Sequence, residues 1–69
     1  GTTLNPPLPG AVLRLSVKDG DTVSEGQEVL VLEAMKMETV ISAPASGTIT
    51  LLVKQGDQVQ TGHPLAEIK

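Results

Sequence analysis

The stretch Glu33-Ala34-Met35-Lys36-Met37-Glu38-Thr39 joins two apolar runs, residues 28–32 and 40–41, near the middle of the chain. If these runs pair as a β-hairpin, the stretch forms its tip. Tight hairpin turns need positive φ angles and therefore favour Asn-Gly, Asp-Gly or paired glycines. Two methionines flank a lysine here instead. Because local rules are broken mostly at functional sites, this tip is the candidate functional site.

Residues 33–38 could alternatively form a short helix, since all of them are good helix formers. The β-rich flanks leave little room for a helix of about two turns, so we expect the hairpin.

Composition indicates one small all-β domain. The chain has 69 residues and no cysteine, phenylalanine, tryptophan or tyrosine. A chain of this length buries only about 60% of its unfolded surface. Its core must consist of Val, Leu and Ile, and β-branched side chains favour strands. Without cysteine, neither a disulfide nor a thiolate metal site can form.

Charge and hydropathy exclude several kinds of partner. The net charge is −3, and there is no basic stripe or aromatic platform, which argues against nucleic acid. No apolar run approaches the roughly 20 residues that span a bilayer, so we expect no direct membrane contact.

The chain contains an internal repeat. Residues 17–23 match residues 53–59 at an offset of 36, and Gly26 matches Gly62 at the same offset. Two such halves are expected to cover each other as a small sandwich or flattened barrel with pseudo-twofold symmetry. The first half has one extra residue between its opening glycine and its lysine, which predicts a β-bulge near Leu13-Arg14.

The expected strands follow the apolar runs, and the first residues are expected to lie outside them. We interpret residues 1–6 as the remnant of a linker from a longer protein and residues 7–69 as the domain, with an edge segment around Leu8. The strands are expected at residues 12–17, 22–23, 28–32, 37–42, 48–53, around 59, and at 65–68.

Lys36 is the leading candidate residue. A lysine in a turn is usually a solvated charge. If Met35 and Met37 are exposed, their apolar side chains gain nothing from contact with water, which suggests that a partner protein binds them. Methionine is flexible and suits such contacts. Lys18, Lys54 and Lys69 lack methionine neighbours and are expected to be solubilising charges.

No catalytic or metal-binding pattern is present. Asp19-Gly20-Asp21 with Glu25 lacks the remaining ligands of a calcium loop. His63 has no second histidine or nucleophile motif near it. We therefore expect no catalysis and no metal site.

Ala34-Met35-Lys36-Met37 resembles the Ala-Met-Lys-Met segment of biotinyl (biotin carboxyl carrier) domains. The resemblance runs from about Pro7 to Lys69 and includes the following further features: Pro9-Gly10, Lys18-Asp19-Gly20-Asp21, Gly26, Glu33, Glu38, Ala43-Pro44, Gly47, Val53-Lys54 and Gly56-Asp57. It implies a barrel-sandwich hybrid of two four-stranded antiparallel sheets.

The resemblance also implies a function. Lys36 would be biotinylated by a biotin protein ligase that reads Met35 and Met37, with Glu33 and Ala34 completing the segment. The biotin would carry carboxyl groups between a biotin carboxylase and a carboxyltransferase or decarboxylase, in the cytoplasm or in the mitochondrial matrix of a eukaryote.

Two alternatives share the implied fold. A lipoyl carrier domain usually has Asp-Lys at the tip. A structural module of an adaptor protein would have no use for a modified lysine. The chain also has no thumb-like insertion between residues 12 and 28, which favours the biotinyl domain of a multidomain carboxylase, transcarboxylase or decarboxylase.

Overall fold

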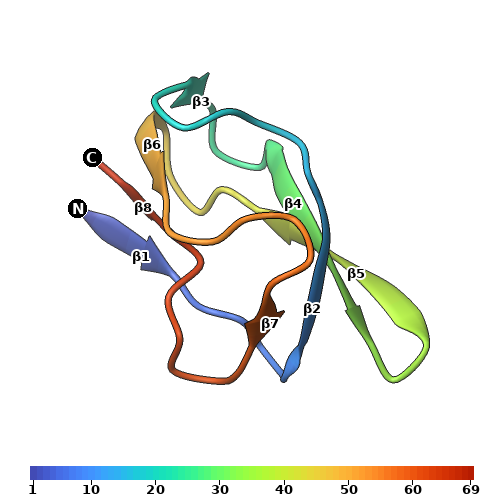
Figure 1. Ribbon diagram of the computed structural model, residues 1–69. Helices are drawn as coiled ribbons and strands as arrows, with labels where there is room; N and C mark the ends of the chain where they lie inside the picture. Colours follow the sequence, from blue (N-terminus) through green and yellow to red (C-terminus); the bar gives the residue numbers. More distant parts are fainter.

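Eight strands form two four-stranded antiparallel sheets in the computed structural model, which describes residues 1–69 (Figure 1). One sheet has the order β5-β4-β2-β7, and the other has the order β1-β8-β6-β3. The expected all-β sandwich is confirmed. The strands are β1 (Thr2–Leu4), β2 (Gly10–Leu15), β3 (Thr22–Val23), β4 (Glu28–Ala34), β5 (Met37–Ser42), β6 (Gly47–Leu51), β7 (Gln58–Val59) and β8 (Ala66–Ile68).

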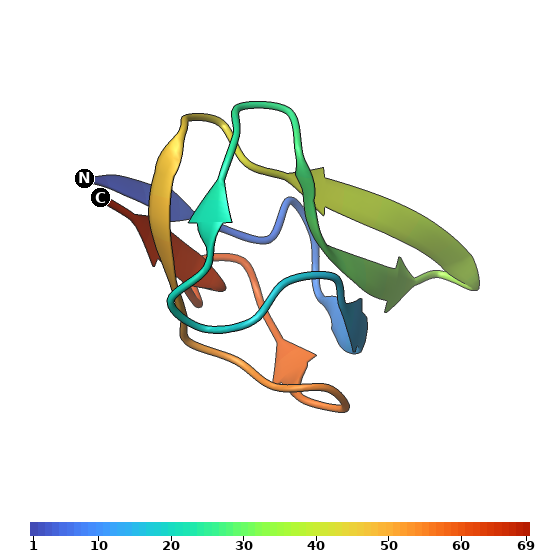
Figure 2. The same cartoon turned by 90° about the horizontal axis from the view of Figure 1, so that it is seen from above.

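Equivalent turns recur at the offset of 36 residues. Gly20 and Gly56 have φ angles of +89° and +92°, and Gly26 and Gly62 have +87° and +89°. Strands β3 and β7 are separated by the same offset. Figures 1 and 2 show both chain termini side by side at one end of the molecule, with the β4–β5 hairpin projecting from the other.

The predicted bulge lies in β2. Its pairing with β4 shifts register between Val12 and Arg14, so Leu13 is the extra residue. Strand β6 pairs with β8 without a shift, through Ile49 with Ile68 and Leu51 with Ala66. The bulge therefore accommodates the residue by which the first half is longer.

The core between the sheets is entirely aliphatic. No polar or charged side chain is buried, and no buried polar side-chain atom lacks a partner. Valine, leucine, isoleucine and alanine side chains fill the space between the sheets. The core members are Leu4, Val12, Val17, Val23, Val29, Leu30, Leu32, Ala43, Ile49, Val53, Val59, Leu65, Ala66 and Ile68.

The expected linker at residues 1–6 is corrected by the structure. Thr2–Leu4 forms β1, which pairs with β8 at the edge of its sheet, and the side chain of Leu4 belongs to the core. Pro6 is also buried, whereas Leu8 lies outside any strand. Residues 2–4 are mostly polar, and they form a strand because they pair with β8 from the other end of the chain.

Gly26→Val is expected to lower the melting temperature by about 5 to 10 °C. A Cβ at Gly26 would meet no atom within 4 Å, so the cost comes from its φ of +87°, which β-branched residues strongly disfavour. The turn cannot easily rearrange, because the Gly26 amide donates a 2.7 Å hydrogen bond to the Ala43 carbonyl. Thermal melts of Gly26→Val and Gly62→Val measure the loss, with about 1 kcal/mol corresponding to 4 to 8 °C at this size.

Gly26→Asn is the matched control for this turn, since asparagine tolerates the left-handed conformation. It should lose clearly less stability than the valine variant. A shift below about one degree for both valine variants would contradict the argument.

Candidate functional site

The candidate site is the two-residue turn between β4 and β5. Ala34 and Met37 form the last residue pair of the two strands, which leaves Met35 and Lys36 as the loop. Their φ angles are +53° and +62°. Consecutive positive φ angles are typical of a type I′ turn, which normally contains Asn-Gly. The predicted hairpin is confirmed, and the alternative helix over residues 33–38 does not form.

The turn places an amine between two exposed apolar side chains. Met35 is 85% exposed and Met37 is 69% exposed, and Lys36 is exposed as well. Ala34, just before the turn, is buried. The left-handed conformation costs about 1 to 2 kcal/mol for each residue with a side chain. The strained backbone conformation at Met35 and Lys36 and the exposed side chains of Met35 and Met37 therefore lie in the segment that the sequence pattern indicates.

Met35→Asn is expected to raise the melting temperature by about 3 to 5 °C. Asparagine adopts positive φ at lower cost, and the mostly exposed methionine side chain gives up little packing. Met37→Asn is the control, because Met37 lies in β5 and has no positive φ to relieve. Thermal melts of both variants test this, and a melting temperature for Met35→Asn at or below wild type would contradict it.

Charged residues near the tip share the outer face of the sheet. Glu38 lies opposite Glu33 across the β4–β5 pair, and like charges in that arrangement repel. Arg14 Nη1 lies 3.6 Å from Glu38 Oε1, in the one ion pair of the chain, and both side chains are about half exposed. Exposed pairs of this kind contribute little to stability. Lys36 is exposed and forms no ion pair.

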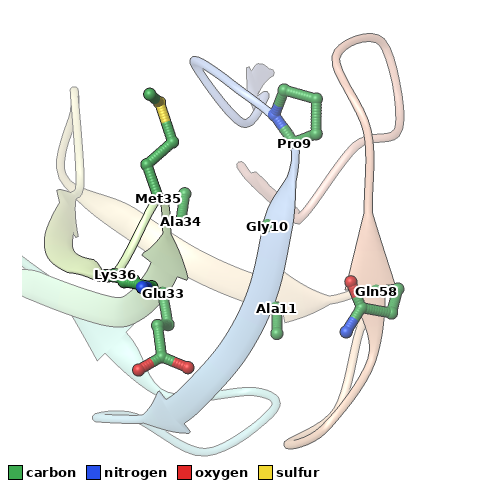
Figure 3. A pocket seen from close by; sticks show the side chains of 8 residues that line it. All are labelled: Pro9, Gly10, Ala11, Glu33, Ala34, Met35, Lys36 and Gln58. Atoms are coloured by element: carbon green, nitrogen blue, oxygen red, sulfur yellow. The ribbon is translucent and has the colours of Figure 1, made fainter.

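A hollow of about 510 Å³ opens beside the turn. Ala11 pairs with Glu33 on one side and with Gln58 on the other, so a small side chain lies between two longer ones. Figure 3 shows Glu33 and Lys36 on one side of β2 and Gln58 on the other. The hollow is lined by Pro9, Gly10, Ala11, Glu33, Ala34, Met35, Lys36 and Gln58.

The structure brings together all five predicted site residues, Glu33 to Met37, because they are consecutive along one hairpin. Gln58 and Ala11 also lie beside these residues and were not expected there. Their positions follow from cross-strand register, and no local signal in the sequence indicates it.

The other candidates take part in turns. Asp21 Oδ2 accepts a hydrogen bond from the Lys18 amide at 2.9 Å, and Asp57 Oδ2 accepts one from the Lys54 amide at 3.0 Å. Asp19 Oδ1 accepts one from the Leu51 amide. His63 is exposed. No group of three His, Cys, Asp or Glu side chains is placed to hold a metal ion, and no helix is long and apolar enough to cross a membrane.

Comparison with known proteins identifies the family. The model of a family described as "Biotin-requiring enzyme" matches residues 2–68. A biotin carboxyl carrier protein of acetyl-CoA carboxylase from Solanum lycopersicum is 50% identical over 68 residues, which cover 97% of each chain. The chain belongs to the biotinyl-domain family. It is therefore a non-catalytic biotin carrier domain, as the tip sequence implied.

Other relatives of this biotinyl domain are parts of much longer chains. The mitochondrial propionyl-CoA carboxylase alpha chain of Mus musculus is 46% identical over 69 residues, which cover 99% of this chain and 10% of that protein. The crystal structure of Kluyveromyces lactis urea carboxylase matches with a TM-score of 0.89 and 35% identity, over 99% of this chain and 6% of that one. The biotinyl domain thus spans a tenth or less of these carboxylases.

Two further solved structures share the fold at low sequence identity. A lipoyl domain of the 2-oxoglutarate dehydrogenase complex from Azotobacter vinelandii matches over the whole chain with a TM-score of 0.86 and 22% identity. A truncated AcrA from Campylobacter jejuni matches with a TM-score of 0.88 and 23% identity. These likenesses account for the architecture and leave the biotinyl assignment unchanged.

Proposed function

We propose that this biotinyl domain carries biotin on Nζ of Lys36 and moves carboxyl groups between the active sites of a biotin-dependent carboxylase or decarboxylase. The observation that carries the proposal is the unpaired Lys36 amine at a two-residue turn between exposed Met35 and Met37. The methionines would be the contacts of a biotin protein ligase, and Glu33 and Ala34 fix the root of the turn.

The residues present fit a covalently attached biotin. Acylation removes the positive charge of Lys36, and no ion pair is lost with it. The lysine is exposed and borders the open hollow, so an added arm displaces no core side chain. Modification at this place is therefore compatible with an unchanged fold.

To be biotinylated, the domain needs only to expose the Lys36 amine to the ligase. The neutral amine of Lys36 would attack the carboxyl carbon of biotin in its activated adenylate, forming an amide while AMP leaves and the amine proton passes to solvent. When bound, biotin supplies a ring that accepts a carboxyl group at one site and releases it at another. Tethering replaces diffusion by a high local concentration.

The implied partners follow from this role. Relatives of the chain are domains within carboxylases. We propose that a biotin carboxylase loads the group, and that a carboxyltransferase or decarboxylase removes it. The setting would be the cytoplasm, or the mitochondrial matrix in a eukaryote.

Intact mass measurement tests the modification. The purified domain is incubated with ATP, biotin and a biotin protein ligase, and in parallel with ATP, lipoate and a lipoate ligase. We expect a mass gain of one biotinyl group in the first reaction only, located at Lys36 by peptide fragmentation. A lipoyl adduct alone would overturn the proposal in favour of a lipoyl carrier, and no adduct would favour a structural module.

A further inference from the structure

Strand β2 begins directly against the root of the β4–β5 hairpin. Its first residue is Gly10, and a Cβ added there would lie 2.6 Å from the Glu33 carbonyl oxygen and 3.0 Å from the Ala34 Cβ. Gly10 has no positive φ angle, so its backbone conformation does not require glycine. The missing side chain is therefore explained by space alone.

The contact between Gly10 and the hairpin lies immediately before the turn that contains Lys36. Glu33 and Ala34 precede Met35 and Lys36 in the chain, and Gly10 and Lys36 line the same hollow. Strand β5 pairs only with β4, so within the sheet the hairpin is held from the β2 side alone (Figure 1). A displacement at Glu33 or Ala34 would pass directly to the lysine.

We propose that Gly10 is a positioning residue for the modification of Lys36. Its bare backbone lets the root of the hairpin lie close against β2, and this fixes where the lysine amine stands relative to the body of the domain. The inference rests on the proposed function of Lys36 as the biotinylation site. A ligase that binds both the body and the tip needs the amine in one place, because a misplacement of about 1 Å can lower a rate by about a hundredfold.

A second glycine with the same kind of close contact supplies a control away from the hairpin. Gly47, unlike Gly10, also has a φ of +157°, so alanine there adds backbone strain to the contact. Gly47 begins β6 as Gly10 begins β2, and a Cβ there would lie 2.5 Å from the Lys69 carbonyl oxygen and 2.8 Å from Ile68 Cγ2. Alanine at either glycine therefore forces a close contact with a backbone carbonyl. Only the contact at Gly10 adjoins the hairpin, whereas Gly47 contacts the C-terminal end.

The experiment compares Gly10→Ala with Gly47→Ala. Melting temperatures are measured first, and kcat and KM for biotin protein ligase are then determined well below both melting temperatures, with ATP and biotin saturating. Both variants should lose several degrees. We expect Gly10→Ala to lose at least tenfold in kcat with KM nearly unchanged, and to shift the amide resonances of Met35, Lys36 and Met37. Gly47→Ala should keep kcat within twofold of wild type and leave those resonances in place.

A second variant covers the case in which Gly10→Ala does not fold. Ala34→Val adds two methyl groups to the side of the hairpin that faces Gly10. Rotation about χ1 can relieve part of the resulting close contact. We expect Ala34→Val to lose less kcat than Gly10→Ala and to keep the dispersed amide resonances of a folded protein. Normal kcat in every folded variant at this gap, or equal losses in Gly10→Ala and Gly47→Ala, would overturn the positioning role. A wild-type domain that is not modified at Lys36 would instead overturn the proposed function itself.

Discussion

Lys36→Arg is expected to abolish biotinylation and leave the fold unchanged. Arginine keeps the positive charge, but its guanidinium stays protonated and cannot act as the attacking amine. The side chain is exposed and forms no ion pair, so the substitution breaks no contact in the domain. Avidin blotting and intact mass after co-expression with a biotin protein ligase should show no adduct, while the melting temperature remains within about a degree of wild type.

Lys54→Arg is the matched control, because Lys54 is also an exposed lysine next to a tight turn. The Lys54 amide donates a 3.0 Å hydrogen bond to Asp57 Oδ2, and the substitution leaves this donor in place. Labelling should equal that of wild type. An avidin signal that persists in Lys36→Arg and disappears in Lys54→Arg would move the site to the second half of the domain.

Ile49→Ala is expected to unfold much of the domain at 37 °C. Ile49 is fully buried in β6, and truncation of such a side chain costs about 2 to 5 kcal/mol. A domain of this length has a total stability of about 5 kcal/mol. The 2.9 Å hydrogen bond from the Ile49 amide to the Asp21 carbonyl does not depend on the side chain, so the loss measures packing alone. Thermal and urea melts should show a decrease in melting temperature of more than about 10 °C.

Leu52→Ala is the corresponding control. Leu52 is an aliphatic residue three positions further on, and 45% of it remains exposed. Its truncation should cost less than about 1 kcal/mol. Similar losses for the two variants would mean that the aliphatic core does not determine the stability of the domain.

The hairpin that bears the candidate site and most of the sandwich could be predicted, because both depend on patterns within short stretches of sequence. Apolar alternation and the repeated Gly-Asp turns mark the strands, and the count of residues between Gly10 and Lys18 revealed the bulge at Leu13. The tip was found because Met35 and Lys36 contradict the usual turn chemistry, and both do adopt positive φ. The regular strand pattern and the unusual turn residues can both be recognised in the sequence alone.

The features that were missed depend on pairing between distant segments. Thr2–Leu4 is short and mostly polar, and it becomes a strand only because β8 lies beside it. Gln58 reaches the hollow because Ala11 pairs with it across β2 and β7. The close approach of Gly10 to Glu33 likewise appears only once the hairpin is packed against β2.

The position of the two chain ends has a mechanical consequence. They lie together, away from the hairpin that bears Lys36, and the Cα atoms of the domain extend 30 Å along its longest axis. Any polypeptide joined at either end would leave from the far side, so a catalytic cleft can close around the lysine without meeting the connection. With biotin on Lys36, as proposed, the length of the domain would add to the reach of the attached arm.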